Sequence, residues 1–335
     1  MKILLTGSAG FIGYHVTQRL LERGDDVVGV DSLNDYYDVS LKEARLKRLR
    51  DVKRFEYERA DIADKVAMER IFASGKFDAI VHLAAQAGVR HSLVNPHAYV
   101  EANVVGFTNI LEGARRQSAK HLVFASTSSV YGLNTSLPLN ERQNTDHPAS
   151  LYAATKKANE AMAHSYAHLF GTPCTGLRFF TVYGPWGRPD MALFKFTRGI
   201  LAGEPIPVFN EGRMVRDFTY ISDIVEGVVR VIDRPAQPDK LWDAGDPSPP
   251  TSAAPWRIYN IGNNRRVELM DYIRAIEEAL GMKAKVEMLP MQPGDVMATE
   301  ADTHALESLT GFRPKTPVRE GVKRFVEWYR GYYKV

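Results

Sequence analysis

The chain has 335 residues, of which 44% are apolar and 25% are charged, as in a water-soluble globular protein large enough for two domains. Its 43 basic and 40 acidic residues leave a formal net charge of +3, so we expect no nucleic-acid partner. The single cysteine, Cys174, excludes an intramolecular disulfide and a cysteine-rich metal site, and we expect no metal.

The first residues show no targeting signal. The apolar run Ile3–Leu5 is interrupted by Thr6-Gly7, far short of the roughly 7–15 apolar residues of a signal peptide. No apolar stretch reaches the ~18 residues of a membrane-spanning helix. We therefore expect a cytoplasmic protein with no membrane partner.

Strand and helix patterns alternate through the first half of the chain. Short apolar runs at 3–5, 27–30, 79–83 and 121–125 predict buried strands, with helical stretches between them. Repeated strand–helix–strand units favour an α/β fold built on a doubly wound parallel sheet of the Rossmann type.

The pattern changes after about Arg178, which indicates a second unit. We predict a Rossmann domain over residues 1–180 and a smaller C-terminal α/β substrate domain over 181–335, with 217–235 returning to the first domain. Residues 246–255 are rich in proline and predict a surface loop. Helical patterns return at 191–202, 222–233, 268–280 and 317–330.

A glycine-rich turn follows the first strand and opens a helix, with the sequence Gly7-Ser-Ala-Gly10-Phe11-Ile12-Gly13. Without side chains, the turn lets a pyrophosphate reach the backbone N–H groups at the helix N-terminus. Asp31, at the end of the second strand, can accept both hydroxyls of an adenosine ribose and would repel a 2′-phosphate. The combination predicts NAD as cofactor, whereas three glycines alone are also typical of a tight turn. Asp61 and Ile62 follow a third strand and either flank the adenine or lie in a solvated loop.

Tyr152 and Lys156 lie four residues apart on a predicted helix and therefore share a face. An ammonium beside a phenol lowers a pKa that starts near ~10, and a positive nicotinamide ring would lower it further. The pair is then a general base near neutral pH. Alone, the spacing is more typical of two unrelated residues. The hydroxyl cluster Ser126–Ser129 ends the strand 121–125, where open α/β sheets bind ligands, although it also suits a polar loop.

Together these residues resemble the extended short-chain dehydrogenase/reductase family, specifically its nucleotide-sugar epimerases, over nearly the whole chain. The stretches 31–38, 178–191 and 252–262 most resemble members that act on UDP-glucuronate. The motifs that fall in family order are Gly7-x-x-Gly10-x-x-Gly13, His82-Leu83-Ala84-Ala85, Asn103, Thr127, Tyr152-x-x-x-Lys156 and Arg216-Asp217-Phe218.

The resemblance implies an NAD-dependent isomerase that interconverts UDP-glucuronate and UDP-galacturonate through a 4-keto sugar. Tyr152 would take the proton of the C4 hydroxyl while the C4 hydride passes to NAD, to return on the other face. Thr127 would hydrogen-bond the C4 oxygen and Lys156 the nicotinamide ribose. Leu83, Ala84, Ala85 and Asn103 would join the glycine turn in binding the cofactor.

Departures from the family pattern bear on the substrate. Dehydratases and decarboxylases of the family carry acids at the positions of Ser128 and Ser129. Because this chain has no acid there to remove the C5 proton, these activities rank second to epimerisation. Epimerases of neutral sugars carry Asn at the position of Thr181 and Arg at that of Gln292, and the change near the sugar fits a different C6 group. Ser128, Ser129, Thr181 and Gln292 are therefore candidate substrate-binding residues. A UDP-glucose/galactose 4-epimerase is a further alternative, and a reductase or a non-catalytic NAD-sensing regulator is less favoured.

Two arginines are candidates for binding the anionic parts of the substrate. Arg188 could pair with a sugar carboxylate, or face solvent in its loop. Arg216 is expected to bind the pyrophosphate together with Lys195, its alternative being a surface salt bridge with Asp217. Asp295 is expected to bind the uridine ribose. In the family, a homodimer formed through a helix bundle is usual, and surface-polysaccharide precursors are the expected product.

Overall fold

A computed structural model describes residues 1–335, and its centre is a seven-stranded sheet in the order β10-β6-β5-β4-β1-β2-β3. Every pairing in this sheet is parallel. The order is that of a Rossmann fold with one strand added beside β6, which confirms the predicted doubly wound α/β sheet. The strands are β1 (Lys2–Thr6), β2 (Asp26–Asp31), β3 (Phe55–Arg59), β4 (Ala79–His82), β5 (His121–Thr127), β6 (Cys174–Phe179) and β10 (Trp256–Ile261).

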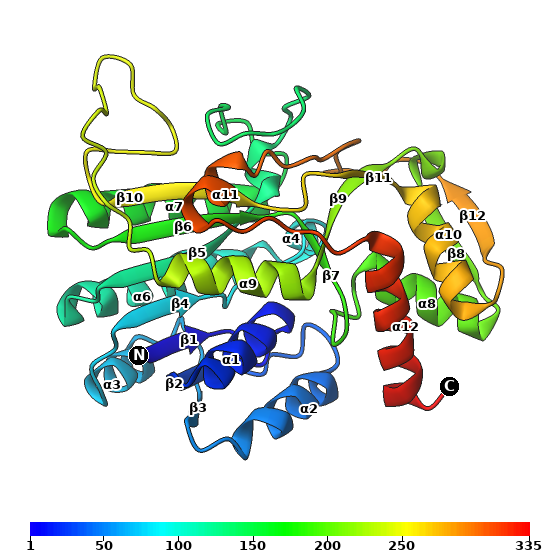
Figure 1. Cartoon of the computed structure of the whole chain (residues 1–335), viewed down its shortest axis with the longest axis horizontal. Helices are drawn as coiled ribbons and strands as arrows, with labels where there is room; N and C mark the ends of the chain where they lie inside the picture. Colours follow the sequence, from blue (N-terminus) through cyan, green and yellow to red (C-terminus); the bar gives the residue numbers. More distant parts are fainter.

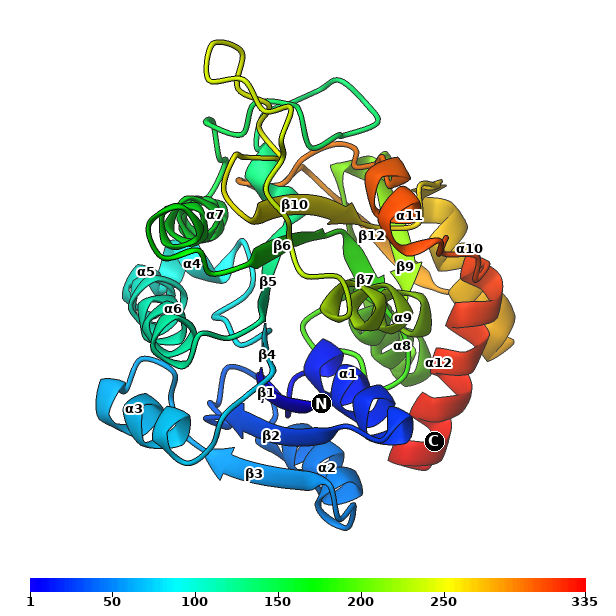
Figure 2. The same ribbon diagram turned by 60° about the vertical axis from the view of Figure 1, so that its left-hand side comes forward.

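Helices cover both faces of this sheet, and Figure 2 shows it nearly edge-on between the two layers. One layer holds α3, α6 and α7, and the other holds α1, α2 and α9. The helices are α1 (Phe11–Arg23), α2 (Val39–Arg50), α3 (Lys65–Ala73), α6 (Gly106–Gln117), α7 (Leu151–Phe170) and α9 (Ile221–Ile232). Two short helices, α4 (His91–Val94) and α5 (Pro96–Tyr99), and a π-helical segment, η1 (Val100–Val105), precede α6.

The second unit lies beside the carboxyl half of the sheet, at the right in Figure 1. It holds a three-stranded sheet in the order β11-β9-β7, a parallel pair β12-β8, and several helices. No helix of the chain combines the length and the apolar character that crossing a membrane requires. The strands are β7 (Thr181–Tyr183), β8 (Pro205–Phe209), β9 (Val215–Tyr220), β11 (Arg266–Glu268) and β12 (Lys285–Leu289), and the helices are α8 (Ala192–Ala202), α10 (Leu269–Leu280) and α12 (Val318–Tyr333), with the 3-10 turn η3 (Asn210–Gly212). The short helix α11 (His304–Thr310) packs on α9 and β10, and a further 3-10 turn, η2 (Ser128–Tyr131), follows β5.

The position of β10 differs from the prediction that residues 181–335 form a separate unit. This strand pairs in parallel with β6, from Trp256 opposite Cys174 to Ile261 opposite Phe179. It completes the large sheet because its buried isoleucine, Ile258, packs into the same core as the neighbouring strands. The chain therefore returns to the large sheet after entering the second unit.

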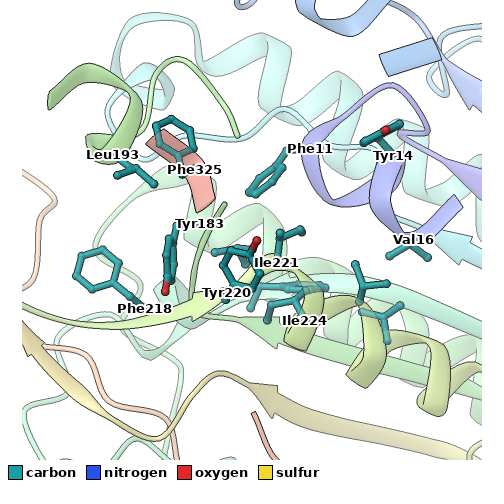
Figure 3. Close-up of a cluster of buried hydrophobic side chains, with 14 of the residues drawn as sticks. Phe11, Tyr14, Val16, Tyr183, Leu193, Phe218, Tyr220, Ile221, Ile224 and Phe325 are labelled. Atoms are coloured by element: carbon teal, nitrogen blue, oxygen red, sulfur yellow. The ribbon is translucent and has the colours of Figure 1, made fainter. Parts of the chain in front are cut away.

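A continuous hydrophobic core joins the sheet and the second unit. Phe11 and Tyr14 of α1 lie in the same buried cluster as Tyr183 of β7, Ile221 of α9 and Phe325 of α12 (Figure 3). Burial of aromatic side chains of this size contributes most of the stability of such an interface. The large sheet and the second unit are therefore fixed relative to each other.

Candidate active site

A pocket of about 770 Å³ lies between the carboxyl ends of the large sheet and the second unit. Its wall combines glycine-turn residues with residues of the second unit, so it is continuous from one predicted subsite to the other. Twenty-one of the predicted site residues line it: Gly7, Gly10, Phe11, Ile12, Gly13, Asp31, Asp61, Ile62, Leu83, Ala84, Ala85, Thr127, Ser128, Ser129, Tyr152, Lys156, Thr181, Arg188, Lys195, Arg216 and Asp295.

The glycine turn is shaped by contacts that only glycine permits. Gly7 has a φ of +77°, and a Cβ there would lie 2.8 Å from the backbone nitrogen of Ala84. A Cβ on Gly13 would overlap the carbonyl oxygen of Gly7. The turn and the loop after β4 are thus packed backbone against backbone, which leaves a cradle open at the N-terminus of α1.

Asp31 ends β2 and points its carboxylate at the pocket's inner edge. It accepts hydrogen bonds from the backbone N–H of Ala9, at 3.1 Å, and of Leu33, at 2.9 Å. The nearby Lys42 is buried and donates to Asn34. The carboxylate is therefore held rigidly where β2 ends, as a ribose-binding acid requires.

Tyr152 lies in the first turn of α7, because the hydroxyl of Ser150 accepts from the backbone N–H of Ala153 and starts the helix there. Burial raises the pKa of Tyr152, while a hydrogen bond with Thr127 and the charge of Arg188 act against the rise.

Lys156 is 2% exposed, and its Nζ has no hydrogen-bond partner. Burial lowers its pKa to about 8, and the carboxylate of Glu160 one turn later opposes this shift. Glu160 is fixed by Arg178, whose Nε and Nη2 donate to it at 2.9 and 2.8 Å. A buried ammonium with unused donors is costly unless a ligand accepts from it, so the geometry favours a ligand-binding role.

The predicted sugar end of the pocket contains an ion pair that the sequence did not suggest. Arg188 is not a free cation, because its Nε and Nη2 donate to Asp190 at 3.0 and 2.5 Å. The hydroxyl of Tyr36 donates to the same carboxylate at 3.1 Å. Ser129 and Thr181 add neutral hydroxyls to this end of the pocket.

The opposite end is basic. Arg216 does not pair with Asp217, which is fully buried and accepts from backbone N–H groups of Asn263 and Ala301. Burial lowers the pKa of Arg216, and Asp295 opposes the shift. The Asp295 carboxylate accepts from Arg90 at 2.8 Å.

Arg90 is a pocket residue that sequence reasoning missed. A usable signal existed, since Arg90 follows β4 at the carboxyl edge of the sheet, where ligands bind. Tyr36 and Asp190 were missed as well. Lys195 lines the pocket as an exposed side chain of α8.

Two predicted residues do not line the pocket, namely Asn103 and Gln292. Asn103 is buried, and its amide bonds the backbone of Gln86 and the hydroxyl of Thr155. These bonds support the loop after β4. The backbone carbonyl of Gln292 accepts from the N–H of Asp295, which fixes the turn that presents this carboxylate.

The comparison with protein families matches residues 3–262 to a family described as NAD dependent epimerase/dehydratase. The chain belongs to this family. A probable UDP-glucuronate 4-epimerase from Rhizobium meliloti is 51% identical over 100% of this chain and 98% of its own. A UDP-glucuronic acid 4-epimerase from Bacillus cereus, solved with UDP-glucuronic acid and NAD, has a TM-score of 0.88 at 31% identity, covering 99% and 100% of the two chains. A UDP-glucose 4-epimerase from Thermotoga maritima has a TM-score of 0.85 at 29% identity, with the same coverage.

This member of the NAD dependent epimerase/dehydratase family has a site that suits the cofactor. A Cβ at Gly7 or Gly13 would collide with the backbone of Ala84 or of Gly7, so the turn needs glycine to pack in the form that leaves the helix N-terminus open to a pyrophosphate. The unpartnered Nζ of Lys156 offers donors to a ribose hydroxyl. A buried ammonium without a partner is costly, and a bound dinucleotide would compensate that cost.

We predict that Asp31→Ala weakens NAD binding by about 1–3 kcal/mol, because it removes a charged acceptor from a polar site. The affinity can be measured by isothermal titration calorimetry, and the NAD content of the purified protein by enzymatic assay of a denatured supernatant. Asp26→Ala is the matched control, since Asp26 begins the same strand and pairs with the exposed Arg54. Equal NAD affinity in Asp31→Ala and wild type would contradict the assignment.

The pH dependence of activity tests Lys156. Its pKa of about 8 means that the ammonium form prevails below that pH and is lost as the pH rises through it. We therefore expect the wild-type rate to fall above about pH 8, and Lys156→Met to lose this fall, which moves its pH–rate profile to higher pH. Lys157→Met is the control, because Lys157 donates to Thr145 outside the pocket. An unchanged profile in Lys156→Met would show that another group sets the alkaline limb.

Proposed function

We propose that the enzyme interconverts UDP-glucuronate and UDP-galacturonate through a 4-keto sugar, using bound NAD. The supporting observation is the chemistry at the sugar end of the pocket. Beside Thr127 and Tyr152 it offers the hydroxyls of Ser128 and Ser129, and its one nearby carboxylate, Asp190, is neutralised by Arg188. A carboxylate loses water on entering such a site and needs donors of this kind.

The proposed reaction uses Tyr152 as the base that takes the proton of the C4 hydroxyl and later returns it. Thr127, which lies beside the phenol and opposes the rise of its pKa, would hold the C4 oxygen in place. Bound NAD supplies a reversible acceptor for the two electrons of the C4–H bond. The positive nicotinamide ring would lower the pKa of Tyr152 further, in the same direction as the charge of Arg188. Lys156 would hold the ribose and add its own charge while protonated.

Elimination of water or loss of CO2 finds less support. Proton removal at C5 needs a base, and Ser128 and Ser129 are not acids at the pH of the cell. A 4-epimerase of neutral UDP-sugars would use the same Tyr152 chemistry and is the alternative that the next experiment separates.

The basic end of the pocket would bind the nucleotide. Arg216, Arg90 and Lys195 offer cationic donors for a diphosphate, and Asp295 an acceptor for ribose hydroxyls. Arg90 holds Asp295 in place at 2.8 Å, so the two would act as a unit. This assignment places the sugar toward Tyr152 and the uridine toward the second unit.

The deciding experiment is incubation with UDP-glucuronate and no added cofactor, followed by NMR. We expect UDP-galacturonate to appear until the two sugars reach equilibrium, and UDP-glucose to be converted far more slowly. A site built on charged or polar donors rejects a ligand without the matching group much more strongly than an apolar pocket does. Equal rates on both pairs of sugars would leave a general 4-epimerase, and a pentose product would indicate a decarboxylase.

Exposed apolar side chains support the expected homodimer. Large apolar side chains are exposed on α4, where Leu93 is 62% and Val94 80% exposed, on η1 at Val100 and Val105, and at the end of α7, where Leu169 is 67% exposed. We propose that a second copy covers part of this surface. Light scattering after gel filtration should then give twice the mass of the chain.

A further inference from the structure

Arg45, on α2, is a buried cation with no acidic partner. It is 0% exposed and takes part in no salt bridge. Burial of a guanidinium is costly unless its N–H groups are hydrogen-bonded, so its hydrogen-bond partners indicate its role. The backbone carbonyls that it bonds are neutral oxygens on two separate loops, Tyr37 adds a hydroxyl from the loop that precedes α2, and Nε has no partner.

One of the two loops belongs to the cofactor site. Nη1 of Arg45 donates to the carbonyl of Ala9, at 2.8 Å, within the glycine turn, and to the hydroxyl of Tyr37 at the same distance. The guanidinium is thereby anchored beneath the dinucleotide cradle.

The other loop is the turn 185–187, which directly precedes Arg188. Nη2 of Arg45 donates to the carbonyl of Trp186 at 2.6 Å and to that of Gly187 at 3.4 Å. The remaining carbonyl of the turn, that of Pro185, accepts from Nε2 of His15 on α1 at 3.0 Å. Three successive backbone carbonyls are therefore held by side chains from the two helices that flank the cofactor site.

The turn needs such restraint. Trp186 has a φ of +62°, a left-handed conformation that costs a bulky residue about 1–3 kcal/mol. Its ring also packs against Tyr14, at 5.8 Å, and Trp328, at 5.2 Å between centroids. A strained turn persists only where its surroundings over-determine it. Here they fix the backbone immediately before Arg188.

We propose that Arg45 is a positioning residue for recognition of the sugar. It locks the turn 185–187 onto the glycine turn and so sets the place of the Arg188–Asp190 pair at the sugar end of the pocket. The inference rests on the proposed function, because it concerns the part of the substrate that carries the C6 carboxylate. It adds a residue from α2, outside the pocket wall, to the determinants of specificity.

The competing explanation is that the buried Arg45 merely stabilises the fold. The two accounts differ in their ligand dependence. A structural weakening should affect every UDP ligand alike, whereas a displaced Arg188–Asp190 pair should affect only a ligand with a C6 carboxylate. Arg45→Lys is the variant of choice, because it keeps the charge but cannot span both loops with a fork of donors.

The test measures binding of UDP, UDP-glucose and UDP-glucuronate by calorimetry, on NAD-loaded protein that also carries Tyr152→Phe to prevent turnover. We expect Arg45→Lys to raise the Kd of UDP-glucuronate by about tenfold or more, the loss of a charged hydrogen bond, with changes under about twofold for the other two ligands. The control is Arg48→Gln on the same helix, where Arg48 lies over the Trp186 ring and bonds Tyr14 but no carbonyl of the turn. Equal weakening of all three ligands, or of none, would overturn the proposal.

Hydrogen exchange keeps this test separate from the proposed function. In Arg45→Lys the amides of residues 184–190 should exchange faster than in wild type or Arg48→Gln, whichever sugar the enzyme uses, and unchanged exchange there would refute the role of Arg45. Wild-type protein that binds UDP-glucuronate no better than UDP-glucose would instead refute the carboxylate assignment. Should Arg45→Lys fail to fold, His15→Phe removes the neighbouring donor and should change exchange and binding in the same direction.

Discussion

Tyr152→Phe should lower kcat for the epimerisation by at least about 10²–10⁴-fold, the usual contribution of general acid–base catalysis. The change removes one oxygen, and the ring keeps its place at the start of α7, with its edge toward Tyr99 at 6.1 Å between centroids. We therefore expect NAD and the UDP-sugar to bind nearly as in wild type. The loss should appear in kcat and leave the Kd of the substrate largely unchanged.

Tyr166→Phe is the matched control for this prediction. Tyr166 lies on the same helix, and its hydroxyl donates to Glu112 at 2.8 Å, outside the pocket. Its removal should cost stability without a comparable loss of rate. A Tyr152→Phe enzyme that retains more than about a tenth of the wild-type rate would transfer the role of base to another group.

The glycine turn and the Tyr152–Lys156 pair were predictable because their geometry is local. A strand, a turn and a helix follow one another within residues 2–23, and a helix brings residues four apart onto one face. Such patterns leave little for the rest of the fold to decide. The sequence did not show how deeply the pair is buried. Burial raises the pKa of Tyr152 and leaves the Nζ of Lys156 without a hydrogen-bond partner.

Asn103 shows what a motif does not specify. It lies in the π-helical segment η1, whose wider turn changes the face that a side chain occupies. Its amide bonds the backbone of Gln86. Local spacing cannot tell a residue that supports the site from one that contacts a ligand.

Predicting the charge partners of the two candidate arginines requires different information for each. Arg216 and Asp217 are neighbours on β9, so their side chains point to opposite faces, and a strand assignment alone would have excluded their salt bridge. Arg188, in contrast, is paired with Asp190 in an arrangement that Tyr36 completes from the loop after β2. That contact joins residues 154 positions apart and required the fold. The pairing of β10 with β6 is long-range in the same way.

Gly13→Ala should remove NAD from the purified protein. Its Cβ would overlap the carbonyl oxygen of Gly7, a backbone atom that cannot turn aside as a side chain can. The glycine turn and the first turn of α1 must then separate, at a cost of about 1–3 kcal/mol or more for overpacking. That separation displaces the N–H groups that bind the pyrophosphate, so we expect NAD affinity to fall by about 10–100-fold and the rate without added cofactor to fall with it.

Gly331→Ala provides the contrast for this last prediction, because a Cβ at Gly331, in α12, meets no atom within 4 Å. It should retain NAD, rate and melting temperature, or gain slightly in stability, since alanine favours a helix over glycine by about 1 kcal/mol. The comparison should be made with and without a saturating excess of NAD. Excess NAD should restore part of the rate of Gly13→Ala, because the proposed catalytic residues Tyr152 and Lys156 lie on α7 and should not be displaced by the turn. Full NAD content in Gly13→Ala would show that the cradle does not hold the pyrophosphate.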